Sequence, residues 1–221
     1  MTQTLRKHPA MKLIAQSFFY ALLALSAAAS FAAGPAPAAA KPDLAKGEAS
    51  FAVCSGCHAA DGNSAIPGNP KLSQQHPEYI IKQLTEYKSG KRANAVMQGL
   101  AAALSEEDMR NIAYWVTTKK VAPGFATDKA LAAQGEKIFR GGIAERGISA
   151  CAGCHGPTGA GIPSQYPRLG GQHAEYTAAQ LTYFRDGIRK NNLQMTQVAA
   201  KLNDREIKAL ADYIAGLRST K

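Results

Sequence analysis

Cys54-Ser55-Gly56-Cys57-His58 is followed, 97 residues later, by a second copy of the same pattern, Cys151-Ala152-Gly153-Cys154-His155. In a Cys-x-x-Cys-His motif the cysteines form thioether bonds to the vinyl groups of a haem, and the histidine binds its iron. All four cysteines of the chain belong to these motifs, so none remains for a disulfide or a catalytic thiolate. The sequence therefore predicts two covalently bound haem c groups, attached at Cys54, Cys57, Cys151 and Cys154, with His58 and His155 as iron ligands.

The haem motifs are part of a longer internal repeat. At the same offset of 97 residues, Pro70-Lys71-Leu72 matches Pro167-Arg168-Leu169. Further matches are Gln75-His76 with Gln172-His173, Glu78-Tyr79 with Glu175-Tyr176, Gln83-Leu84-Thr85 with Gln180-Leu181-Thr182, and Arg92 and Asn94 with Arg189 and Asn191. A repeat of this length predicts two tandem copies of one module. We expect a first domain over 43–118, a linker over 119–127 and a second domain over 128–221, with a glycine-rich surface loop inserted before the second haem motif.

The periodicity within each copy is helical. Ser105 and Asp108, and likewise Asn203 and Glu206, form capping-box patterns ahead of apolar residues at helical spacing. A middle helix is expected to begin near Pro77 and to stop at Gly90, with its counterpart stopping at Gly187. Because no convincing alternating strand pattern is present, the predicted fold class is all-α.

The N-terminus has the pattern of an export signal. Basic residues precede an apolar stretch that ends in small residues, which predicts a cleavable signal peptide over residues 1–33 and periplasmic localisation. Residues 34–42, rich in Ala and Pro, are expected to form a disordered lead-in. A transmembrane anchor is the alternative, but the densest apolar part is shorter than the roughly 20 residues that a span needs. We therefore expect a mature chain without a membrane span, with peripheral membrane association left open.

The sixth ligand of each iron decides whether it transfers electrons or carries out chemistry. Met97 and Met195 lie at matching positions, 39 and 40 residues after the motif histidines, in what we expect to be a loop before the last helix. A lone methionine is usually core filler, but its recurrence favours a ligand role in both copies. His76 and His173 also recur and are the competing ligands; the alternative for them is a local hydrogen bond at the start of the middle helix.

Pro70 and Pro167, each 12 residues after a motif histidine, are either turn prolines or carbonyl acceptors for the imidazole N–H. At this point the chain resembles small c-type cytochromes twice over, and as a whole the c4-type dihaem cytochromes. The resemblance covers residues 44–217. It implies the carbonyl role for both prolines, and two domains packed about a pseudo-twofold axis with the haem propionates facing one another. It also implies packing of the first helix of each copy on the last, at Gly47 and Phe51 against Tyr114 and Trp115, and at Gly135 and Phe139 against Tyr213.

The formal net charge is +10, and it falls to +7 without the N-terminal segment because three basic residues and no acidic ones are lost. The second half is the more basic, with 13 Lys and Arg against 8 Asp and Glu in residues 126–221. No basic stripe interleaved with aromatics is present, so nucleic acid is not an expected partner. An acidic docking surface on a redox partner fits better.

Two irons without a vacant site predict a soluble periplasmic electron carrier rather than an enzyme. The c4-type resemblance implies transfer from a quinol-oxidising complex to a terminal oxidase. A cytochrome subunit of a flavin dehydrogenase is the alternative within the same class. A dihaem peroxidase or sulfur-compound-oxidising enzyme is the alternative from another class, but it would need an iron that can open or a fifth cysteine. Structural zinc or a redox dithiol would need further ligands or a βαβ context.

Overall fold

The computed structural model of the protein describes residues 41–218, and all of the regular structure in that range is helical. It contains no strand, only isolated bridges between Ile143 and Ile148 and between Ile162 and Tyr166. The all-α prediction is confirmed. The signal peptide expected over 1–33, and the lead-in over 34–42 except for its last two residues, lie outside the described residues.

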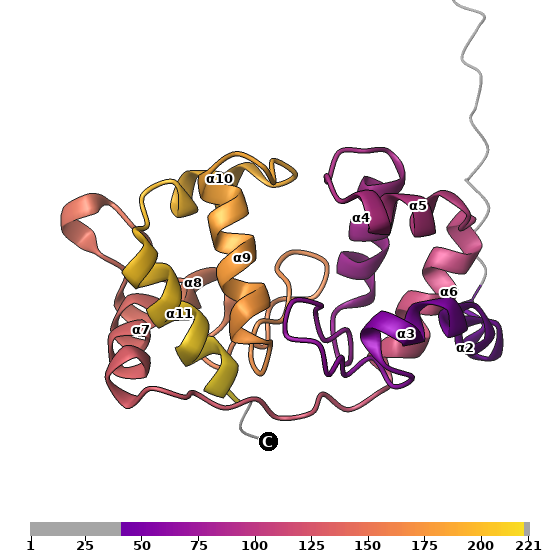
Figure 1. Ribbon diagram of the computed structural model, residues 1–221, viewed down its shortest axis with the longest axis horizontal. Helices are drawn as coiled ribbons and strands as arrows, with labels where there is room; N and C mark the ends of the chain where they lie inside the picture. Colours follow the sequence, from indigo (N-terminus) through magenta and orange to yellow (C-terminus); the bar gives the residue numbers. More distant parts are fainter. Residues whose placement is uncertain (1–40, 219–221) are drawn as a thin grey trace, which may run out of the picture. The chain divides into compact units, whose positions relative to one another are not determined.

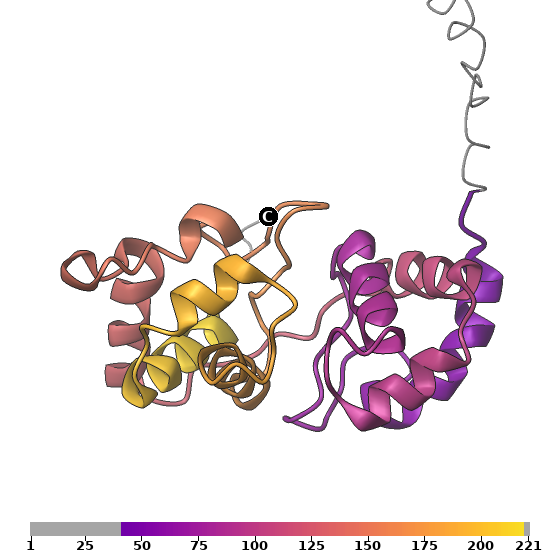
Figure 2. The same ribbon diagram turned by 90° about the horizontal axis from the view of Figure 1, so that it is seen from above.

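The helices form two groups that lie side by side in both views (Figure 1 and Figure 2). The first group contains α2 (Leu44–Phe51), η1 (Ala52–Cys54), α3 (Ser55–His58), α4 (Pro77–Lys88), α5 (Ala95–Ala102) and α6 (Glu106–Thr117). The second contains α7 (Lys129–Gly141), η2 (Ala144–Arg146), α8 (Ala152–His155), α9 (Ala174–Arg185), α10 (Leu193–Ala199) and α11 (Asp204–Gly216). The order of elements is the same in both groups, as the internal repeat requires, although η1 contains Cys54 whereas η2 lies in the insertion before the second motif.

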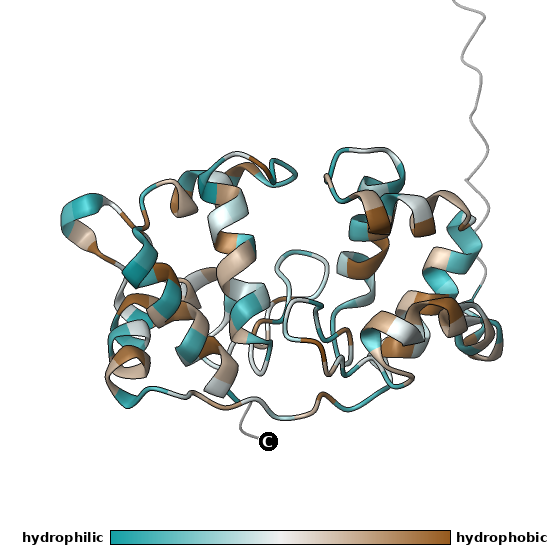
Figure 3. Cartoon of the chain, in the orientation of Figure 1, coloured by the Kyte–Doolittle hydropathy of each residue, from teal (hydrophilic) through white to brown (hydrophobic). Residues whose placement is uncertain are grey.

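Each group packs its own elements in the same way. In the first, α2 contacts α6, and α4 contacts α5 and α6; in the second, α7 contacts α11, and α9 contacts α10 and α11. Phe51 and Trp115 belong to one apolar core, Phe139 and Leu210 to the other. Both hydrophilic and hydrophobic residues occur along α11 (Figure 3), and its Ile207, Leu210 and Ile214 belong to the second core, as expected of a helix with one apolar face. No helix among the described residues combines the length and hydrophobicity needed to cross a bilayer.

Two glycines allow the first and last helices of each group to cross closely. A Cβ placed on Gly47 would lie 2.8 Å from Cβ of Trp115, and one on Gly135 would lie 2.8 Å from Cβ of Tyr213. Both distances are too short for any larger residue. Adjacent aromatic pairs then fill the crossing, with ring centroids 4.9 Å apart for Phe51 and Trp115 and 5.4 Å apart for Phe139 and Tyr213. The expected packing of the first helix on the last is confirmed in both copies.

The predicted helix ends are also confirmed. Ser105 with Asp108 and Asn203 with Glu206 form complete capping boxes at the starts of α6 and α11. The chain leaves α4 through Gly90 at φ +77°. Its counterpart after α9, Gly187, has φ +70°. This left-handed conformation costs glycine little, which explains why both middle helices stop there.

The segment that joins the two groups, residues 118–128, contains no helix. This agrees with the expected linker, although its exact bounds stay a prediction. The insertion before the second haem motif is partly ordered rather than a simple loop. Gly141 ends α7, a single 3₁₀ turn follows, and Ile143 and Ile148 pair across it. Arg146 in this turn forms an ion pair with Glu206 at the start of α11, which ties the insertion to the second core.

Candidate haem sites and the contact between them

The two haem motifs lie on short helical turns. Cys54 ends η1 and Cys57 and His58 lie in α3, while Cys151 precedes α8 and Cys154 and His155 lie within it. The first cysteine of each pair is half-buried and the second is exposed. Burial raises the pKa of Cys54, with a smaller contribution from Cys57, and burial raises the pKa of Cys151 to about 11. A protonated thiol is a poor nucleophile, so these environments do not suit a catalytic thiolate.

Both motif histidines are buried, with 6% and 5% of their surface exposed. Nδ1 of His58 lies 2.9 Å from the Pro70 carbonyl oxygen, and Nδ1 of His155 lies 3.0 Å from that of Pro167. Since a carbonyl only accepts, Nδ1 carries the proton in each ring and Nε2 presents a lone pair. Burial lowers the pKa of both imidazoles, and the proline carbonyls oppose it only in part. Each histidine is therefore presented as a neutral, oriented nitrogen donor.

A cavity beside the first motif is suited to a flat apolar group that is bonded to both cysteines. Its lining consists of Val53, Cys54, Cys57, His58, Leu84, Met97, Leu100, Ala101 and Leu104. Val53 and Leu100 line this cavity and are 66% and 37% exposed. A porphyrin in this cavity would cover them. The residues present therefore fit a covalently bound haem.

The two methionines lie in short helices rather than in the loop expected from the sequence. Met97 is in α5 and Met195 in α10. Asn94 Oδ1 accepts from the Met97 N–H at 2.9 Å, and Asn192 Oδ1 accepts from that of Met195 at 2.8 Å. Asn192 is thus the N-cap of α10, whereas the constant offset of 97 residues pairs Asn94 with Asn191. The second copy therefore has one extra residue just before this N-cap.

Met109 occupies a different environment. It is 2% exposed within the first core, and its sulfur accepts a hydrogen bond from the Thr85 hydroxyl at 3.7 Å. It does not line the cavity beside the first motif, whereas Met97 does.

His76 and His173 precede α4 and α9, but the expected local hydrogen bonds are absent from both side chains. Both occupy the N-cap position, as expected, but neither side chain forms a capping hydrogen bond. Instead, Nε2 of His76 lies 2.9 Å from the Ala160 carbonyl oxygen, and Nε2 of His173 lies 2.7 Å from that of Ser64. Each histidine thus bonds to the opposite domain. The position at the helix start was predicted correctly, but the expected local hydrogen bond was wrong, because a sequence does not show an acceptor 84 or 109 residues away.

A polar cluster between the domains was also missed. It consists of Tyr79, Gln83, Glu86, Arg92, Tyr176, Gln180, Arg189 and Asn191. Arg92 donates to Tyr176 and Gln180 of the second domain, and Arg189 donates to Tyr79 and Gln83 of the first. The recurrence of these tyrosines, glutamines and arginines at an offset of 97 was visible in the sequence, and it was the signal for a pseudo-symmetric contact.

The charges of this cluster are not balanced by the described residues. Arg92 and Arg189 are 5% and 7% exposed, and neither has a carboxylate within ion-pair distance in residues 41–218. The buried carboxylate of Glu86 already pairs with Lys82 and Lys91. Burial opposes ionisation of Tyr79, yet the charges of Arg189 and Arg92 outweigh it and lower the pKa of that phenol. Buried cations without counter-charges fit the anionic propionates of bound haems.

Each half of the molecule thus has the helix order, the buried histidine and the cysteine pair of a small c-type cytochrome. The family model for cytochrome c matches the chain twice, over residues 44–120 and 132–218. Cytochrome c4 of Pseudomonas aeruginosa is 48% identical over 179 residues, which cover 79% of this chain and 89% of that protein. A crystal structure of reduced recombinant cytochrome c4 from Pseudomonas stutzeri superposes with a TM-score of 0.77 at 44% identity, covering 80% of this chain and all of that one.

A thiosulfate dehydrogenase electron acceptor of Stutzerimonas stutzeri is 39% identical and covers 75% of this chain and 79% of that protein. The chain belongs to the cytochrome c4 family. It carries two covalently bound haem c groups and is an electron-transfer protein, not an enzyme.

Proposed function

We propose that the protein is a periplasmic carrier of single electrons between a quinol-oxidising complex and a terminal oxidase. His58 and Met97 are the axial ligands in the first domain, and His155 and Met195 in the second. Cys54, Cys57, Cys151 and Cys154 hold the haems covalently, and Pro70 and Pro167 fix the imidazoles. The observation that carries this proposal is the cavity that Cys54, Cys57, His58 and Met97 line together.

When bound, each haem supplies a one-electron couple at its iron. The residues around each haem favour electron transfer over catalysis. A neutral Nε2 on one side and a thioether on the other leave no position for substrate or peroxide. Leu84, Leu100 and Leu104 keep the cavity apolar, and thioether ligation favours the ferrous state. Both potentials are therefore expected to be high.

The periplasmic location rests on the sequence of residues 1–33, because secretory signals begin with a basic segment followed by an apolar one. Covalent attachment of the haem is consistent with that compartment, where the protein would also meet other exported redox proteins. The basic second half favours partners with acidic docking surfaces, whose main effect is on the rate and orientation of association.

A second candidate donor is a thiosulfate-oxidising dehydrogenase. Two relatives, 39% and 35% identical, carry the name thiosulfate dehydrogenase electron acceptor. This candidate changes the source of the electrons and leaves the proposed haem ligands unchanged.

The ligand assignment is tested on the ferric protein. We expect a far-red sulfur-to-iron absorption band of the strength of two methionine-ligated haems, slow binding of azide and cyanide, and no turnover of peroxide. The reason is that each sixth position is closed by a thioether. Rapid azide binding to either haem, or a band of half the expected strength, would contradict methionine ligation in one domain.

The donor is tested by stopped-flow reduction of the ferric protein. A purified quinol-oxidising complex and a purified thiosulfate dehydrogenase, each with its substrate, are compared at increasing salt. We expect faster reduction by the quinol-oxidising complex, with a rate that falls as salt screens the attraction between a basic carrier and an acidic partner. Faster reduction by the thiosulfate dehydrogenase would select the second candidate.

A further inference from the structure

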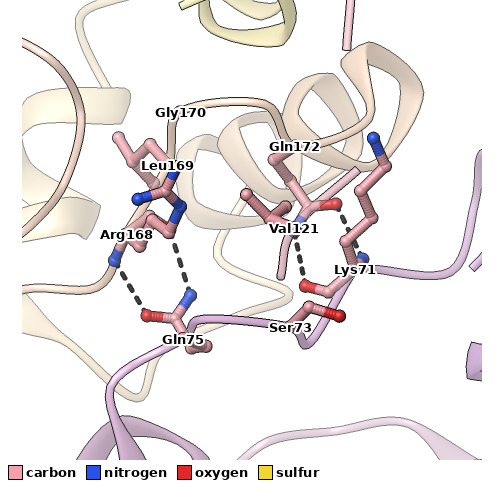
Figure 4. A pocket seen from close by; sticks show the side chains of 8 residues that line it. All are labelled: Lys71, Ser73, Gln75, Val121, Arg168, Leu169, Gly170 and Gln172. Carbon is pink, nitrogen blue, oxygen red and sulfur yellow. Dashed lines mark hydrogen bonds between the residues drawn. The ribbon is translucent and has the colours of Figure 1, made fainter. Parts of the chain in front are cut away.

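The two glutamines that precede His76 and His173 reach across the domain contact and each bond to a single residue on the other side (Figure 4). Gln172 Oε1 accepts from the Lys71 N–H at 2.9 Å, and Gln172 Nε2 donates to the Lys71 carbonyl at 2.9 Å. In the mirrored contact, Gln75 Oε1 accepts from the Arg168 N–H at 2.8 Å, and Gln75 Nε2 donates to its carbonyl at 3.0 Å.

The orientation of each amide is fixed by its neighbours. Gln172 Oε1 also accepts from the His173 N–H at 3.0 Å, and Gln75 Oε1 from the His76 N–H at 3.1 Å. Each oxygen therefore faces two N–H groups, while each nitrogen faces a carbonyl. A flipped amide would place donors against donors, so the oxygen must point at the N–H of the opposite domain.

These N–H groups belong to the same peptide units that accept from the motif histidines. The Lys71 N–H and the Pro70 carbonyl are the two ends of one peptide bond, and the Pro70 carbonyl accepts from Nδ1 of His58. The Arg168 N–H and the Pro167 carbonyl are related to His155 in the same way. The chain of contacts runs from a glutamine of one domain, through one delocalised amide, to the imidazole of the other domain.

Hydrogen bonds in such a chain strengthen one another, by roughly 10–30% per bond. An acceptor on the N–H side draws electron density toward the carbonyl oxygen, which then accepts more strongly from the imidazole. A stronger bond at Nδ1 makes Nε2 a better donor and favours ferric iron.

We propose that Gln172 lowers the reduction potential of the first haem and Gln75 that of the second, each from the opposite domain. Both glutamines are positioning residues that act through a peptide group. This inference rests on the proposed ligation by His58 and His155. It makes domain docking a determinant of both potentials, because separating the domains would remove both relays at once.

The test compares Gln172→Leu and Gln75→Leu with the parent protein by spectroelectrochemical titration, the two couples being assigned through Met97→His. Gln172→Leu should raise the potential of the first haem only. The expected shift is roughly a two- to threefold higher ferrous-to-ferric ratio at a fixed potential, or about 18 to 28 mV at 59 mV per tenfold. Gln75→Leu should do the same to the second haem only. In ferrous protein labelled with ¹⁵N-histidine, the Nδ1–H proton of His58 should move upfield in Gln172→Leu.

One further variant separates the relay from loosening of the interface. Tyr79→Phe removes the hydrogen bond from Arg189 across the contact and leaves both peptide groups intact, so neither Nδ1–H resonance should move. A rise of both potentials together in Gln172→Leu would overturn the relay. Unmoved potentials with an intact far-red band would also overturn it while leaving the proposed ligands in place; a missing band in the parent protein would instead refute the ligands.

Discussion

Replacing Cys54 and Cys57 together by alanine should yield a chain with one covalent haem and an unfolded first domain. The alkaline pyridine haemochrome per chain should fall by half, because only Cys151 and Cys154 remain to form thioethers. About half of the helical residues belong to the first group of helices, so the far-ultraviolet circular dichroism should lose a similar share.

The size of this effect follows from the smallness of the domain. Emptying a single phenylalanine site in a core costs about 3–5 kcal/mol, and a haem leaves a larger space among Leu84, Leu100 and Leu104. A domain of this size has a total stability of only about 5 kcal/mol or somewhat more, because it buries a small fraction of its surface. The free energy lost with the haem is therefore expected to exceed the folding stability that the first core alone supplies.

The matched control is the mirrored variant with Cys151 and Cys154 replaced. It should also lose half of the haemochrome, but the helices that remain should be those of the first group. A doubly substituted chain that kept both haems, or lost one haem with unchanged circular dichroism, would contradict this account of the domain.

The features predicted correctly from sequence are those that depend on local chemistry. The capping boxes at Ser105 and Asn203 are satisfied within a few residues, and Gly90 and Gly187 stop their helices through their own backbone conformation. The close crossing at Gly47 was correct for another reason, since it came from a resemblance to known cytochromes and not from the residue pattern.

The features that were missed depend on partners far away in the chain. His76 and His173 looked like helix-start residues, yet their acceptors lie in the other domain. The helix around Met97 is only eight residues long, too short for its periodicity to stand out from a loop. The recurrence of Arg92 at Arg189 was visible, but a repeat alone does not tell a residue that stabilises each copy from one that joins the two copies.

One local departure between the copies is resolved by the structure. Ser73 and Gln74 stand where the second copy has Gly170 and Gly171. Gln74 adopts φ +56°, the same left-handed region as Gly171 at +81°, and the Ser73 hydroxyl donates to the Asp61 carbonyl at 2.6 Å. The first copy keeps the turn with a non-glycine residue that adopts this region less readily.

Replacing Met97 by histidine should lower the potential of the first haem by on the order of 0.2 V, a quarter of the range of about 0.8 V over which axial ligands set haem potentials. The imidazole stabilises ferric iron, whereas the thioether it replaces favours the ferrous state. The far-red band of the ferric protein should fall to half, and the same change at Met195 should remove the other half and lower the other potential. Spectra and potentiometric titrations of both single variants measure this directly.

Met109→Leu provides the matched control for Met97→His. It also removes a methionine sulfur from the first domain, but Met109 lies in the core with its sulfur bonded to Thr85. Leucine and methionine are close in volume, so the change should cost less than about 1.5 kcal/mol. Both potentials and the full band should survive it. If Met109→Leu halved the band while Met97→His left it whole, the first iron would be ligated by Met109 of α6 and not by Met97 of α5. The two copies would then differ in how they bind iron, because the second copy has no methionine at the position that corresponds to Met109.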